Sequence, residues 1–186
     1  MLTQALLKLM KHESLSTSET QSALEEVLEK KNPLATASFL TLLRAKGETV
    51  DELYAFIKVF KKHMIGLDFD NVFDIVGTGG DGKQTVNIST AAALVLSGLG
   101  VRVLKHGNRS VSSLSGSADF MEALGINPEM SPQKIKDSLH EANFGFAYAP
   151  LFHPIFKTLS SLRKELGVPT TLNLLGPLLN PAQASV

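Results

Sequence analysis

The feature that most constrains the fold of this chain is an apolar run that breaks into a glycine-rich loop and then into helix-capping residues. Phe73 to Val76 are expected to form a strand, residues 77–82 include four glycines, and an apolar helix is expected from Ile88 to Leu99. Glycine permits positive φ and lets a ligand approach the backbone closely. The start of the helix, near Asn87 to Thr90, adds unpaired N–H groups and the positive end of the helix dipole. The sequence therefore predicts a strand, loop and helix that bind phosphate.

Two nucleotide-binding motifs match this loop, and neither is complete. The glycines of 77–82 satisfy G-x-G-x-x-G, but the acidic residue that should follow about 20 positions later for a ribose hydroxyl is missing. No Asp or Glu occurs between this loop and Ala118. Residues 77–83 also satisfy G-x-x-x-x-G-K, but Gln84 stands where a nucleotide-triphosphate loop needs Ser or Thr for magnesium. A nucleotide switch that depends on Lys83 is therefore only an alternative.

Two further polar segments are expected beside the first loop. A short strand from Val101 to Leu104 leads into the loop Lys105 to Arg109, and successive parallel strands bring their carboxyl ends to one edge of a sheet. Residues 112–119 are rich in serine and precede a helix expected from Asp119 to Leu124. The simpler alternative is that Lys105 and Arg109 are solvated. Residues 82–118 form an acid-free window, meaning a stretch without Asp or Glu, and this favours phosphate binding. The basic residues in this window are Lys83, Arg102, Lys105, His106 and Arg109.

The first 65 residues predict helices only. Ser18–Gln21 and Thr49–Glu52 both have the spacing of a capping box, and each precedes apolar residues at helical spacing. Pro33 is expected to open a helix that ends near Gly47, where glycine suits a C-terminal cap. We therefore expect a small helical domain over residues 1–66.

From about Leu67 the pattern changes to short apolar strands that alternate with helices, as in an α/β domain with a mostly parallel sheet. A serine-capped helix is expected from Pro132 to Ala142, followed by a strand from Phe144 to Ala149. His153-Pro154 then opens a helix that carries Phe156, Leu159, Leu162 and Leu166. The fold class expected is a small all-helical N-terminal domain followed by an incomplete, mostly parallel α/β domain.

Composition excludes several classes of protein. The chain has 186 residues, 44% of them hydrophobic, enough for a sizeable core. Its net charge of zero argues against nucleic-acid or membrane partners held by bulk charge. It has no cysteine, so disulfides and thiolate metal sites are excluded. No apolar run reaches the roughly 18 residues needed to span a bilayer, and no signal peptide is evident, so a cytoplasmic location is expected.

Four motifs follow one another along the chain: G-T-G-G-D at 77–81, N-x-S-T at 87–90, K-H-G-N-R at 105–109 and S-G-S-A-D at 115–119. In this order and spacing they resemble the anthranilate phosphoribosyltransferase family, which belongs to the nucleoside phosphorylase-like phosphoribosyltransferases. The resemblance covers essentially the whole chain and includes His153-Pro154, Arg163 and the run Leu175 to Pro181.

The resemblance implies transfer of the 5-phosphoribosyl group from phosphoribosyl pyrophosphate (PRPP) to the amine of anthranilate, with Mg²⁺ as cofactor, in tryptophan biosynthesis. It also implies a homodimer formed by the helical domain. Residues 67–186 would be the first part of the PRPP-binding domain, and residues 153–186 are candidates for packing back on the helical domain.

Carried over by motif, two groups of site residues are expected. Gly77, Asn108 and Arg163 would hold anthranilate, and Ser89 would lie near the metal. No residue is assigned as an acid or base, and without the family pattern Arg163, His106 and His153 would each be read as structural. The residues expected to line the PRPP site are Gly77, Gly80, Asp81, Thr85, Asn87, Ile88, Ser89, Thr90, Lys105, Gly107, Asn108, Ser113 and Ser117.

Two departures from the family pattern affect these expectations. Leu114 stands where many relatives carry a basic or polar residue, which should change pyrophosphate contacts without abolishing them. An adjacent Asp-Glu pair that binds magnesium in the family is not found after Arg163. The chain therefore resembles an N-terminal portion with an open sheet edge, and we expect weak catalysis from it alone. The alternative is a non-catalytic fragment that binds ligand or dimerises.

Overall fold

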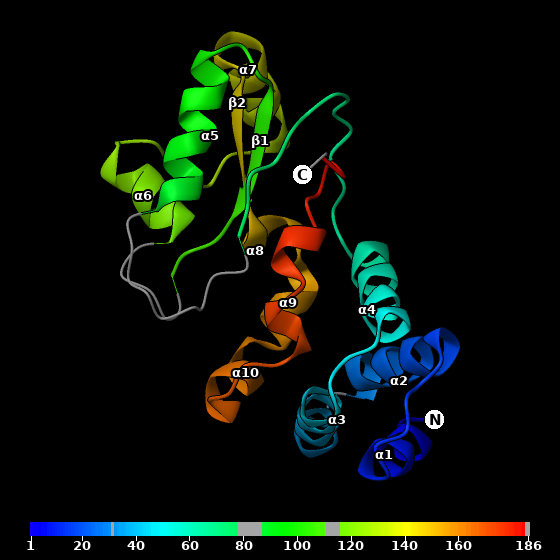
Figure 1. Cartoon of the computed structure of the whole chain (residues 1–186). Coiled ribbons are helices and arrows are strands. Elements are labelled where there is room, and N and C mark those ends of the chain that lie inside the picture. Colours follow the sequence, from blue (N-terminus) through cyan, green and yellow to red (C-terminus); the bar gives the residue numbers. More distant parts are fainter. Residues whose placement is uncertain (31, 78–86, 111–115, 185–186) are drawn as a thin grey trace. The chain divides into compact units, whose positions relative to one another are not determined.

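The computed structural model describes residues 1–30, 32–77, 87–110 and 116–184, and the chain divides into two compact units. The helical unit comprises Met1–Met64 and Pro154–Leu178, and the α/β unit comprises Ile65–His153 and Leu179–Val186. The elements of the helical unit are α1 (Leu2–Met10), α2 (Thr17–Lys30), α3 (Pro33–Lys46), α4 (Val50–Lys62), α9 (Pro154–Thr158), α10 (Ser160–Leu166) and the 3₁₀ turns η1 (Thr171–Asn173) and η2 (Gly176–Leu178) (Figure 1). Those of the α/β unit are α5 (Ile88–Gly98), β1 (Val103–Gly107), α6 (Ser117–Ala123), α7 (Pro132–Ala142), β2 (Phe144–Tyr148) and α8 (Ala149–Phe152).

Aromatic side chains form the centre of the helical unit. Phe39 and Phe56 stack with their ring centroids 6.3 Å apart, and Phe56 stacks on Phe60 at the same distance. Phe156 of α9 lies 4.7 Å from Phe60, ring centre to ring centre. Thr171 of η1 donates a hydrogen bond of 2.8 Å to Glu48, which follows α3. Two separate stretches of the chain, Met1–Met64 and Pro154–Leu178, therefore share one core.

Most of the predicted helix ends are confirmed. The Thr49–Glu52 capping box is present, α3 begins at Pro33 and Gly47 ends it with a φ of 89°. The capping box predicted at Ser18–Gln21 is wrong, because the reciprocal bonds join residues 16 and 19 instead. The Glu19 N–H donates to Ser16 Oγ over 3.3 Å, and the Ser16 N–H donates to the Glu19 carboxylate over 2.9 Å.

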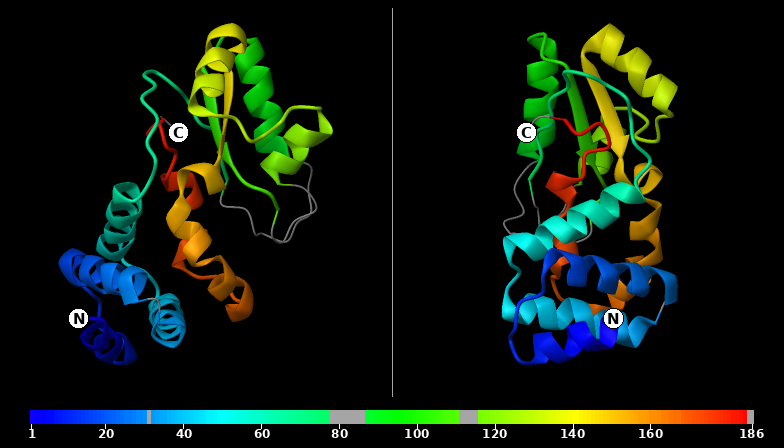
Figure 2. Two further views of the ribbon diagram at one scale, coloured as in Figure 1. Left: turned by 180° about the vertical axis from the view of Figure 1, so that it is seen from behind. Right: turned by 90° about the vertical axis from the view of Figure 1, so that its right-hand side faces the viewer.

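The α/β unit is built on a two-stranded parallel sheet. β1 pairs with β2 in a register that places Val103 beside Phe144 and Gly107 beside Tyr148. Phe146 faces a cluster that includes Ala93 of α5, whereas Ala147 faces Ile135 of α7. The two helices thus cover opposite faces of the sheet, with α5 and α7 on either side of the strands (Figures 1 and 2). The predicted fold class is confirmed.

Three strands differ from the sequence-based predictions. The strand predicted at Val101 to Leu104 begins and ends later, as β1, and so contains Lys105 and His106. β2 ends at Tyr148, because Ala149 begins the short helix α8. The strand predicted at Phe73 to Val76 is reduced to a single bridge between Phe73 and Val103.

The helix predicted after His153-Pro154 is interrupted at Leu159, between α9 and α10. The Leu159 N–H donates to the carbonyl only three residues back, and the Ser160 hydroxyl donates to the Lys157 carbonyl over 2.8 Å. Both bonds compete with the regular helical ladder and tighten the chain at this point. In the described part of the chain, no helix is long and apolar enough to cross a membrane.

Candidate functional site

Four of the residues predicted for the PRPP site meet at the start of α5. Asn87 caps this helix, since its Oδ1 accepts from the Thr90 N–H over 3.1 Å. Ser89 Oγ lies 3.3 Å from the same oxygen and 3.4 Å from Lys105 Nζ. Lys105 lies on β1, so the strand and the helix together bring a lysine, a hydroxyl and the positive end of a helix to one place.

Lys105 is buried within β1, although the sequence analysis assigned it to a loop. Its side chain is accommodated because Nζ donates to the carbonyl of Ile75 over 2.6 Å. Burial lowers the pKa of Lys105, and the charge of Asp74 raises it. An ammonium has three donors, and only the bonds to Ile75 and Ser89 use them among the described residues. The described residues therefore use two of its three donors.

A buried polar network that the sequence analysis missed lies beneath this lysine. Asp74 accepts from the His106 N–H over 3.2 Å and from Asn180 Nδ2 over 2.9 Å. Burial raises the pKa of Asp74, against the hydrogen bonds from Asn180 and His106, which lower it. The one sequence signal was a carboxylate inside an apolar run, which is costly unless it is hydrogen-bonded. Asn180 could not be paired with it from spacing, because 106 positions separate the two.

The second and third predicted loops touch through their backbones. The Ala118 N–H donates to the Asn108 carbonyl over 3.2 Å. A Cβ on Gly116 would lie 2.2 Å from the backbone nitrogen of Ser110, and a Cβ on Gly107 would lie 2.7 Å from Cβ of Ser117. Glycine is therefore required here for close approach, and Gly107, Asn108 and Ser117 are brought together as predicted site residues.

Arg109 is not available as a general phosphate-binding charge. Its guanidinium donates to the Glu122 carboxylate over 2.6 Å and lies 3.4 Å from Asp119. Asp119 also accepts from the N–H groups of Ser110 and Gly116, which ties the second loop to the start of α6. The acid-free window ends at Ala118, and the acids just beyond it neutralise Arg109.

Two buried histidines lie next to this network. The ring of His153 is 5.0 Å from that of His106, centroid to centroid, and His153 is fully buried. Burial, and then the proximity of His106, lowers the pKa of His153 to about 4. An imidazole that stays neutral near pH 7 fits the structural role given to it in the sequence analysis.

The structure describes only some of the remaining predicted site residues. Gly77 is exposed two residues after Ile75, and Ile88 is exposed at the first position of α5. Arg163 belongs to the helical unit, where its guanidinium lies 5.8 Å from the centre of the Phe156 ring. Burial lowers the pKa of Arg163. The predicted residues Gly80, Asp81, Thr85 and Ser113, together with Leu114, lie outside the described residues.

The donor set near α5 suits a hard cation that arrives with its own oxygen ligands. Ser89 Oγ and Asn87 Oδ1 are oxygen donors, which Mg²⁺ prefers, but the Lys105 ammonium is their neighbour. Among the described residues, no three His, Cys, Asp or Glu side chains gather as a metal site. The described oxygen donors would therefore suit Mg²⁺ only if ligand oxygens filled most of its coordination sphere.

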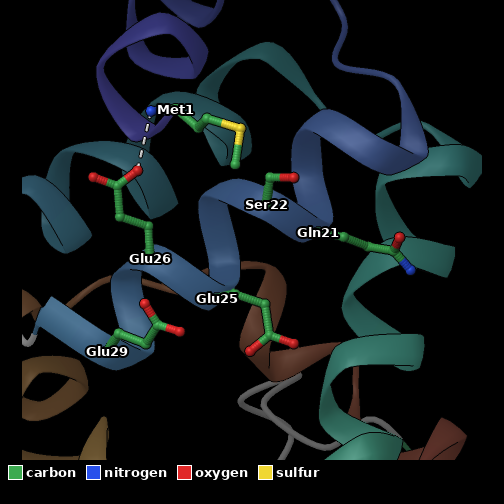
Figure 3. A pocket seen from close by; sticks show the side chains of 6 residues that line it. All are labelled: Met1, Gln21, Ser22, Glu25, Glu26 and Glu29. Carbon is green, nitrogen blue, oxygen red and sulfur yellow. Dashed lines mark ion pairs between the residues drawn. The ribbon is translucent and has the colours of Figure 1, made fainter.

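The helical unit carries a surface hollow of about 420 Å³ lined by α2 and Met1, and Glu25, Glu26 and Glu29 are among its lining residues (Figure 3). Glu26 pairs with the terminal amine of Met1 over 3.1 Å, as Figure 3 shows, and also accepts from the Leu2 N–H. Glu25 pairs with Lys62 and His63. These carboxylates hold helix ends in place, and their charge does not suit a phosphate.

Comparison with known families matches both parts of the chain. The description "Glycosyl transferase family, helical bundle domain" applies to residues 3–64, and "Glycosyl transferase family, a/b domain" applies to residues 70–186. Anthranilate phosphoribosyltransferase of Acetivibrio thermocellus is 48% identical over 99% of this chain and 54% of its own length. The enzyme of Priestia megaterium is 46% identical over 100% of this chain and 55% of its own length. The chain spans about half the length of the curated relatives it matches.

Solved structures agree with these matches and confirm the resemblance. Anthranilate phosphoribosyltransferase from Thermus thermophilus is 40% identical with a TM-score of 0.86, covering 96% of this chain and 55% of that chain. The Saccharomyces cerevisiae enzyme in complex with PRPP and Mg is 33% identical with a TM-score of 0.87, covering 97% and 55%. The chain therefore belongs to the glycosyl transferase family that joins a helical bundle domain to an α/β domain.

Proposed function

We propose that this chain binds PRPP with Mg²⁺ at the carboxyl end of β1 and the start of α5. The observation that carries the proposal is the placement of the Lys105 ammonium beside Ser89 at a capped helix N-terminus. A diphosphate carries several negative charges, and a lysine with helix N–H groups is suited to them. The S. cerevisiae relative that binds PRPP and Mg supports this ligand.

The reaction proposed is transfer of the 5-phosphoribosyl group to the amine of anthranilate. The amine nitrogen bonds to the anomeric carbon, the bond from that carbon to the pyrophosphate oxygen breaks, and one amine proton is lost. The products are N-(5-phosphoribosyl)anthranilate and pyrophosphate. We assign the reaction to tryptophan biosynthesis in the cytoplasm, following the relatives named anthranilate phosphoribosyltransferase.

The chain's own contribution to this step is electrostatic. Negative charge grows on the leaving pyrophosphate, and preorganised donors stabilise such charge without reorganising. Lys105 and the first N–H groups of α5 are the donors assigned to it. Mg²⁺, held by the diphosphate and Ser89, would supply further positive charge to the leaving oxygens.

The anthranilate residues are assigned by motif alone. Gly77 and Asn108 belong to the α/β unit and Arg163 to the helical unit. A guanidinium can bind a carboxylate through two hydrogen bonds, which is the role proposed for Arg163. An S. cerevisiae relative in complex with 4-fluoroanthranilate, 31% identical with a TM-score of 0.82, supports this class of acceptor.

A homodimer through the helical unit completes the proposal. Leu7, Met10 and Leu34 of α1 and α3 are exposed by 56%, 65% and 80% of their surface, which is high for large apolar side chains. Light scattering should give about twice the chain mass of 20.0 kDa. Leu7→Glu should return it to one chain mass, whereas a monomeric parent chain would contradict the dimer.

Calorimetry separates binding from turnover. We expect PRPP to bind with MgCl₂ present and more weakly without it. An assay for N-(5-phosphoribosyl)anthranilate with both substrates then tests transfer. Because the chain spans about half of its relatives, binding without turnover would favour the second function, a non-catalytic ligand-binding module. Absence of PRPP binding would overturn both.

A further inference from the structure

The segment before Gly77 begins to pair with β1 and then stops. The Phe73 N–H donates to Arg102 O, and the Leu104 N–H donates to Phe73 O, both over 2.9 Å. A parallel ladder would continue two residues later, with bonds from Ile75 N to Leu104 O and from His106 N to Ile75 O. Neither bond is present, although all of these residues are described.

Side chains replace the missing bonds on the β1 side. The Leu104 carbonyl accepts from Asn180 Nδ2 over 2.9 Å. The His106 N–H donates to Asp74 Oδ1 over 3.2 Å. Both β1 groups that should pair with Ile75 are therefore occupied, as buried backbone groups must be.

The Ile75 carbonyl is satisfied in the same way, since it accepts from Lys105 Nζ over 2.6 Å. Three side chains thus bind three of the four backbone groups of one absent rung. In a regular ladder the Ile75 carbonyl would accept from His106 N, which would leave only the second lone pair of that oxygen for Lys105.

Asp74 and Asn180 are fixed to each other as well as to the backbone. Asn180 Nδ2 lies 2.9 Å from Asp74 Oδ2, and Asn180 Oδ1 accepts from the Ala182 N–H over 2.9 Å, which sets the orientation of the amide. Both residues are less than 5% exposed. A buried polar pair that is fully satisfied selects one backbone arrangement, because any other leaves groups unpaired.

We propose that Asp74 and Asn180 act as a wedge that ends strand pairing at Phe73 and thereby positions Lys105 for the diphosphate of PRPP. The proposal rests on the proposed function for its ligand. Asp74 and Asn180 are positioning residues, since they act through Ile75 and Lys105.

The first experiment needs no ligand. An NMR coupling between Ile75 N and the Leu104 carbonyl carbon reports whether the Ile75 N–H donates to the Leu104 carbonyl oxygen. The wild type should lack this coupling, and the double variant Asp74→Ala/Asn180→Ala should show it because the rung can close. If the double variant does not fold, Asn180→Ala is used, since it frees Leu104 O for Ile75. A folded variant without the coupling would overturn the wedge.

The second experiment measures PRPP affinity in the presence of MgCl₂. Asn180→Ala should weaken binding by at least about tenfold per folded molecule, the effect of losing one charge-assisted hydrogen bond. Asn127→Ala removes an exposed asparagine that only bonds its own turn, to Glu129 N, and should leave affinity unchanged. Unchanged affinity in Asn180→Ala would reduce Asn180 to a purely structural role and overturn the positioning claim. If the wild type binds no PRPP, the proposed function fails. The NMR result still decides whether Asp74 and Asn180 end the strand pairing at Phe73.

Discussion

Replacing His153 with glutamine tests how a buried imidazole couples the stability of this chain to pH. Burial, and then His106 with its ring centroid 5.0 Å away, lowers the pKa of His153 from the ordinary 6.5 to about 4. The unfolded chain therefore takes up the proton at a higher pH than the folded chain. The stabilising contribution is present above pH 6.5 and is lost progressively as the pH falls towards 4.

The size of the effect follows from the two pKa values. The full difference corresponds to about 3 kcal/mol. Between pH 7 and pH 5, the same linkage removes about 2 kcal/mol from the free energy of unfolding. That loss is large compared with the total stability of a typical domain, about 5–15 kcal/mol.

Urea denaturation at pH 7 and pH 5 measures this directly. The loss of stability between the two pH values should be about 2 kcal/mol smaller in His153→Gln than in the wild type. His140→Gln removes an exposed histidine of α7 and should keep the wild-type loss. Equal pH dependence in the wild type and His153→Gln would refute the reasoning.

Two other substitutions probe close contacts. Gly116→Ala should cost about 1–3 kcal/mol of unfolding free energy, because a Cβ there would lie 2.2 Å from Ser110 N. The control Gly98→Ala meets nothing within 4 Å and should be neutral or stabilising. Equal unfolding free energies for the two variants would contradict the close contact between the loops. Glu52→Gln should cost about 3 kcal/mol or more, because it leaves the Lys46 ammonium, 2.9 Å from the carboxylate, buried without its charge partner. A loss below about 1 kcal/mol in urea denaturation would show that this pair is as weak as a surface ion pair.

The helix boundaries were accessible from sequence where the signal is local. Each signal involves residues of one helix and its caps, and the structure contains all three. They are Pro33 and Gly47 at the ends of α3, the Thr49–Glu52 box of α4 and the Ser131 cap of α7. The box at Ser16 was misplaced by two positions because the segment has several hydroxyl residues, and only the actual bonds to Glu19 distinguish them.

The strand boundaries depended on distant residues. Lys105 looks like a loop residue in sequence, but the carbonyl of Ile75, 30 positions earlier, accepts its ammonium inside a strand. Pairing at Phe73 stops because Asn180, 76 positions after Leu104, takes the next carbonyl. No periodicity over a short window carries this information.

In the candidate site, too, local features could be predicted from sequence, whereas contacts between distant residues could not. The Asn87 cap follows from local chemistry, whereas the close approach at Gly107 and Gly116 depends on how separate segments meet. The neutralisation of Arg109 by Glu122 depends on how the loop folds against α6, and an acid-free stretch of sequence does not reveal it. Sequence predicts where phosphate binds, and tertiary contacts decide which charges of that region already have partners.

The central claim is that Lys105 holds the diphosphate of PRPP, and calorimetry of two lysine variants tests it most directly. Lys105→Met removes the buried ammonium beside Ser89, whereas Lys136→Met removes an exposed lysine of α7. With MgCl₂ present, PRPP affinity should fall by at least about tenfold in Lys105→Met and stay at the wild-type value in Lys136→Met. Equal PRPP affinity in a folded Lys105→Met and in the wild type would contradict the claim.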